Sequence, residues 1–179
     1  MTFPVFASGD VLNASDMNAV GLWLVKTQTI GSAVSSVQVT GAFSADYDNY
    51  LITITGGAGS ANADMTFQLG ATTTGYYGHL LYGNYNLNNA LGAGHANSAS
   101  FQFVGAVTTS KLDAMIQIHS PFLTEETNFY SRFATQLTTG INANFAGYLN
   151  NTTSYTAFTI APSSGTLTGG AIKVYGLRN

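Results

Sequence analysis

The residues in this chain that are most able to do chemistry are three histidines, His79, His95 and His119. No two of them have the four-residue spacing of metal ligands on one helix face, and no two share a strand face nearby in the sequence. Serines are abundant, but none stands in the G-x-S-x-G turn that presents a catalytic serine. We therefore expect no metal site and no catalytic residues, in a protein that is not an enzyme.

The carboxylates and glycines form patterns that suggest sites but lack essential parts. Asp46 and Asp48 resemble the start of a calcium loop, but the turn glycine and the terminal glutamate are missing. Glu125 and Glu126 are adjacent, so on a strand they would point to opposite faces and could not act as a pair. The glycine cluster at 56–59 is followed by strand-like alternation and not by a phosphate-binding helix. We expect no cofactor.

A tyrosine- and asparagine-rich stretch, residues 75–97, is the best candidate for a binding segment. Aromatic faces and side-chain amides suit sugars, and tyrosine is also enriched where protein copies meet. We favour an interface between copies over a glycan site. The stretch is expected to form a strand pair with a long loop that reaches to about Gly94. Its candidate contact residues are Tyr76, Tyr77, Tyr82 and Tyr85.

The elements that must position these residues are strands, because apolar and polar residues alternate along most of the chain. Ile52 and Ile54 alternate with threonines, and Ile116 and Ile118 alternate with Gln117 and His119. Such a period of two indicates strands with one face in a core. Short strands separated by turn residues, with no long helix, predict an all-β fold, an antiparallel β-sandwich of jelly-roll-like type.

The N-terminal segment has a different pattern and is expected to form a separate part. We divide the chain into an anchoring extension with a short helix, residues 1–22, and a β-sandwich domain, residues 23–179. The helix is expected over residues 11–20, where Asn13 or Ser15 can cap its start and Gly21 can end it. The candidate anchor residues are Phe3, Phe6, Val11 and Leu12.

Composition limits the function further. Only 7% of the residues are charged, against roughly 25% in an average domain. A weakly charged surface favours contact with other protein copies. Five scattered basic residues argue against a nucleic-acid partner. No apolar run is long enough for membrane insertion, and we expect synthesis in a cytoplasm, without a signal peptide.

Four segments of the chain carry a family resemblance. The segment FASGDVLNASDMN, residues 6–18, resembles the N-terminal segment of many phage minor tail and fibre-like proteins. Further segments are similar to a β-sandwich domain of small virion proteins from cyanobacterial and marine phages. They are GLWLVKTQTI at 21–30, FSADYDNY at 43–50 and GTLTGGAIKVYG at 165–176.

The resemblance implies a structural protein of the virion, made in the cytoplasm of the bacterial host. We expect a tail-associated role at a tail tip, fibre or adaptor, with other virion proteins and further copies of itself as partners. A homotrimer is expected by analogy with phage fibres and decoration proteins. The alternatives are a capsid decoration or cement protein, and a module that binds a host surface glycan.

Overall fold

The computed structural model describes residue 9, residues 21–135 and residues 140–177, and every regular element there is a strand. The expected helix at 11–20 lies outside the described residues. So do the four anchor residues Phe3, Phe6, Val11 and Leu12.

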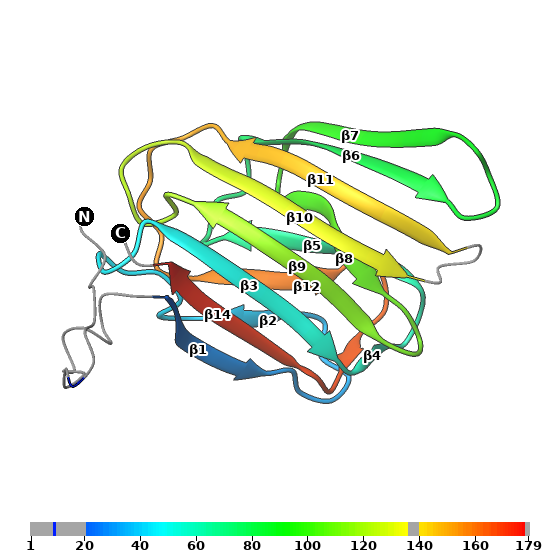
Figure 1. Ribbon diagram of the computed structural model, residues 1–179, viewed down its shortest axis with the longest axis horizontal. Coiled ribbons are helices and arrows are strands. Elements are labelled where there is room, and N and C mark those ends of the chain that lie inside the picture. Colours follow the sequence, from blue (N-terminus) through cyan, green and yellow to red (C-terminus); the bar gives the residue numbers. More distant parts are fainter. Residues whose placement is uncertain (1–8, 10–20, 136–139, 178–179) are drawn as a thin grey trace.

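The larger layer, which we call the front sheet, is antiparallel throughout (Figure 1). Its strands, in spatial order, are β1 (Leu22–Thr29), β14 (Ala171–Leu177), β3 (Asn49–Gly56), β9 (Leu112–His119), β10 (Thr127–Thr135), β11 (Ile141–Leu149), β6 (Tyr76–Asn84) and β7 (Ala90–Ser98).

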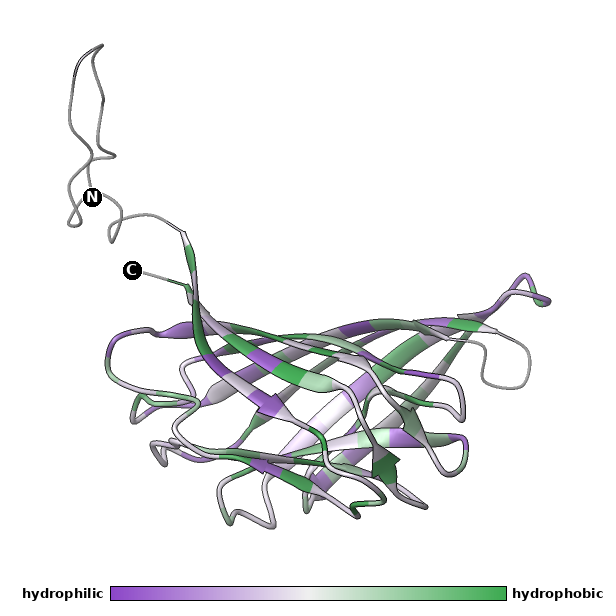
Figure 2. Ribbon diagram, turned by 90° about the horizontal axis from the view of Figure 1, so that it is seen from below, coloured by the Kyte–Doolittle hydropathy of each residue, from purple (hydrophilic) through white to green (hydrophobic). Residues whose placement is uncertain are grey.

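The smaller layer, the back sheet, lies behind it, and Figure 2 shows the two layers from the side. Its strands, in order, are β2 (Val37–Val39), β12 (Phe158–Pro162), β5 (Ala63–Leu69) and β8 (Phe101–Val107). A short separate ribbon pairs β4 (Ala58–Gly59) with β13 (Leu167–Thr168). The predicted all-β sandwich is confirmed.

The two layers are joined at the hairpin between β8 and β9. Ala106 and Val107 pair with Asp113 and Leu112 of β9 and also with β5 of the back sheet. The rest of β8 pairs with β5 alone. From Met115 onward β10 takes the place of β8 beside β9. One hairpin therefore starts both layers, and β9 becomes a central strand of the front sheet.

The core lies between the layers and is rich in aromatic rings. Phe67 stacks on Phe158 with ring centroids 4.6 Å apart, and Phe101 stacks on Phe129 at 4.5 Å. All four rings are fully buried. Ile52, Ile54, Ile116 and Ile118 are buried as well, as their alternation predicts. Strands with one apolar face each are thus held together by burial of that face.

Residues 75–97 form a hairpin with a shorter loop than expected. The strand β7 begins at Ala90, so the expectation that the loop extends to about Gly94 is wrong. Small residues such as those of β7 have weak strand preference by themselves. Pairing with β6 from Gly83 to Tyr76 supplies the backbone hydrogen bonds that hold them extended.

Candidate binding surface

The front sheet has an uncovered face, which we call the outer face. Along β9 and β10 every second side chain is buried and the others are exposed or half-buried. Because directly paired residues of antiparallel strands share a face, the register extends this surface from β1 to β7. One row on it runs from Leu51 through Gln117, Tyr130 and Ala146 to His79.

Large apolar side chains gather on the outer face. Among the described residues nine such side chains are exposed, and only Tyr85 and Leu87 lie elsewhere, in the turn between β6 and β7. Leu22, Leu24 and Leu177, which we call the edge patch, lie together where β1 pairs with the end of β14. The remaining four are Leu81, Met115, Tyr130 and Tyr148.

A depression of about 310 Å³ lies near the middle of the outer face, over β9, β10, β11 and β6. In the row that crosses it, the small side chain of Ala146 stands between Tyr130 and His79. The next row adds Arg132 and Asn144, with Met115 and Leu81 at its ends. Because the methyl group of Ala146 is much smaller than the rings on either side of it, a depression forms there. Polar and apolar side chains surround this depression.

Glycines on β7 make room for one wall of the depression. A Cβ added at Gly92 would lie 2.8 Å from Cε1 of His79, and one at Gly94 would lie 3.1 Å from its Cδ2. Side chains at these two positions would therefore meet the His79 ring. Beyond the depression, Tyr77 stacks on Tyr148 with centroids 5.1 Å apart, and His119 packs beside Tyr130 at 5.4 Å.

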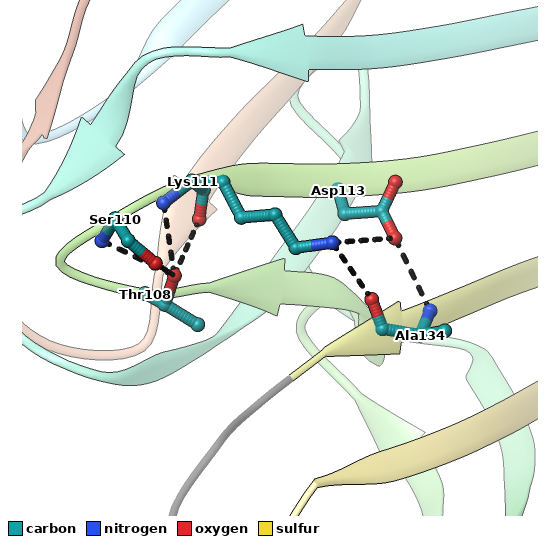
Figure 3. Close-up of polar contacts among 5 residues, drawn as sticks. All are labelled: Thr108, Ser110, Lys111, Asp113 and Ala134. Carbon is teal, nitrogen blue, oxygen red and sulfur yellow. Dashed lines mark hydrogen bonds and ion pairs between the residues drawn. The ribbon is translucent and has the colours of Figure 1, made fainter.

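The only carboxylate on the outer face of the described strands already has partners (Figure 3). The backbone N–H of Ala134 donates to Asp113 Oδ2 at 3.1 Å, and Lys111 Nζ lies 3.9 Å from the same oxygen. Lys111 Nζ also donates to the carbonyl of Ala134 at 3.1 Å. Asp113 and Lys111 thus form hydrogen bonds with the backbone of β10 just past Arg132. At this point the pairing of β10 with β9 ends.

The structure separates the four candidate tyrosines. Tyr76 is fully buried, and its hydroxyl accepts from the Leu69 N–H at 2.8 Å, so it offers no surface to a partner. Burial strongly raises its pKa. Tyr82 packs half-buried against the core on the inner side. Tyr77 is half-buried on the outer face, Tyr85 is 64% exposed in the turn, and Tyr82 lines a hollow on the inner side. These three can meet a partner, whereas Tyr76 cannot.

Residues of β9, β10 and β11 form most of the depression and were not among the sequence candidates. The signal that points to them is the polar half of the alternation, Gln117 with His119 and Tyr130 with Arg132. Alternation shows that such side chains share a face. It does not show which strands are neighbours, and the depression depends on that.

The histidines and acids are dispersed. His79 and His119 lie on the outer face, whereas His95 points inward and stacks on Phe145 at 5.6 Å. Burial lowers the pKa of His95. Asp46 accepts from Ser44 Oγ at 3.0 Å within its turn. In the described part of the chain no three histidine or acidic side chains gather as a metal site would require, and no helix there could span a bilayer.

Comparison with known proteins leaves the family open. No protein-family model matches the sequence, and no curated protein is similar to it. A subviral particle structure of infectious bursal disease virus VP2 is 8% identical, with a TM-score of 0.18, over 86% of this chain and 42% of that chain. The structure of the Gx strain of that virus is 11% identical, with a TM-score of 0.19, over 86% and 41%. This chain thus spans less than half of either.

Proposed function

We propose that this chain is a non-enzymatic structural protein of a phage virion, associated with the tail and assembled as a symmetric homo-oligomer. The resemblance of residues 6–18 to minor tail proteins and the 7% charged content support the proposal. A particle protein present in several copies can bury a weakly charged surface in repeated contacts.

The observation that carries the proposal is the edge patch. Among the described strands, β1 pairs only with β14, so one side of its backbone is open to another strand. Leu22 and Leu24 belong to this edge strand and are exposed on its outer face, and Leu177 lies beside them. An edge strand with exposed leucines is a template for contact with another chain. In the sequence, the segment that we expect to act as an anchor directly precedes β1.

The experiment that tests the virion role is the copy number of this chain in purified phage particles. Quantitative mass spectrometry would compare it with the major capsid protein. We expect a low copy number in multiples of three, as for a tail tip, fibre or adaptor. Abundance equal to the capsid protein would instead make it a capsid decoration protein, and absence from particles would overturn the virion role.

A further inference from the structure

We propose that the depression on the outer face binds an acidic saccharide, with Arg132 recognising its carboxylate. This site is independent of the oligomer contact, because the edge patch lies at β1 and the depression lies over β9, β10, β11 and β6.

Because the depression lies over the interior of the sheet, a ligand there would be bound by side chains and not by backbone groups of an open strand edge. Each of its four strands has a hydrogen-bonded strand on both sides, since β6 is flanked by β11 and β7, and β9 by β3 and β10. A bound peptide that adds a strand needs an open edge, and the depression has none. Its volume of about 310 Å³ falls at the lower end of the roughly 300–1,000 Å³ range of small-ligand sites.

The polar groups of the depression match a ligand with many hydroxyls. Gln117 and Asn144 each present an amide that both donates and accepts, and His79 adds a ring nitrogen. Tyr130 adds an exposed ring, whose apolar surface can cover one side of a sugar ring. In the part of the chain that the structure describes, no hydrogen bond or ion pair engages the side chains of Gln117, Asn144 or Arg132.

The charge of the face selects an anionic ligand. Arg132 stands in the depression without an acidic partner among the described residues. The nearby carboxylate of Asp113 is turned to Lys111 and to the backbone of Ala134 (Figure 3). A guanidinium group binds a planar carboxylate through two parallel hydrogen bonds. A hydroxyl-rich ligand that carries a carboxylate is a saccharide with uronate or sialate units.

The test is a binding experiment on the full chain with paired saccharides. The probes are galacturonate oligomers and sialylated oligosaccharides, each beside its uncharged counterpart of the same length, with affinity measured by calorimetry. We expect the acidic member of at least one pair to bind more tightly. Arg132→Gln should weaken its binding roughly tenfold to hundredfold and leave the uncharged member unchanged. Asn144→Ala should weaken both members.

The matched control is Lys173→Gln, which removes the same charge from the same face at β14. It should leave binding unchanged at moderate salt, because exposed charges that far apart are screened. Equal losses in both variants would mean diffuse attraction and overturn the site. So would the lack of binding by every acidic probe. A change of oligomeric state in Arg132→Gln would instead mark the depression as a contact between copies. Arg132→Gln and Lys173→Gln should both have the melting temperature of the wild type, since both side chains are exposed.

Discussion

At the scale of single residues, the direction of a tyrosine side chain decides whether it supports the fold or can contact a partner. Tyr76 and Tyr77 are neighbours in sequence, yet the first holds the Leu69 backbone inside the core and the second stacks on Tyr148 at the surface. Tyrosine in a strand therefore has two roles, and the direction of the side chain decides which one applies.

His95 should make stability depend on pH. Its ring stacks on Phe145, and none of the described residues gives its nitrogens a hydrogen-bond partner. Burial lowers its pKa below the ordinary 6.5. The His95 ring therefore binds its second proton more tightly in the unfolded state than in the folded state. The free energy of unfolding should be highest above pH 6.5 and should fall as the pH drops toward the folded-state pKa.

Denaturant unfolding at a series of pH values checks this expectation. His95→Phe keeps a ring against Phe145 and removes the titrating group, so this part of the pH dependence should disappear. His119→Gln changes an exposed histidine on the outer face and should retain it. An unchanged pH profile in His95→Phe would show that another group causes the effect.

At the scale of elements, two turns that follow strands contain a glycine with positive φ, and only one of these glycines has little room. Gly57 lies between β3 and β4 with φ of 68°, and a Cβ there would overlap the carbonyl oxygen of Gly169 in the turn before β14. Gly41 has a similar φ of 63° after β2, but a Cβ there would meet nothing within 4 Å. An alanine at either position would have an unfavourable positive φ. Only at position 57 would its Cβ also overlap another part of the chain.

Gly57→Ala and Gly41→Ala should therefore destabilise the protein unequally. We expect a loss of about 1 kcal/mol for Gly41→Ala, from the left-handed backbone alone. For Gly57→Ala we expect about 3 kcal/mol, because the turn must also move. Thermal or denaturant unfolding of both variants measures the difference. Equal losses would mean that the turn at Gly57 can move away from the turn at Gly169 at no energetic cost.

At the scale of the whole molecule, the edge patch should control association between copies. Leu24 is 56% exposed on β1, and Leu87 is 52% exposed in the turn between β6 and β7. A lysine at an open strand edge opposes pairing with another strand. Leu24→Lys should shift a homotrimer toward monomer, while Leu87→Lys should not.

Light scattering coupled to size-exclusion chromatography, over a range of protein concentrations, measures this shift. The wild-type chain should elute as an oligomer at the highest concentration. A wild-type chain that stays monomeric at every concentration would contradict self-association. Dissociation to the same extent in both variants would move the contact away from the edge patch.

The sequence by itself determined the fold class and the faces of the strands. Alternation assigned Ile52, Ile116 and Ile118 to the core because a strand has a side-chain period of two and one face must leave water. By the same period of two, Tyr130 and Arg132 share one face of their strand. These are local properties, read from neighbours one or two positions away.

Only the tertiary structure decided which strands are neighbours, and with it the depression. His79 and Arg132 belong to segments far apart in the chain, and β11 brings them within two strands of each other. Strand order depends on where the β8–β9 hairpin divides into two layers, and no local pattern records that division. The inward turn of Tyr76 and the room that Gly92 and Gly94 leave for His79 likewise depend on packing between strands.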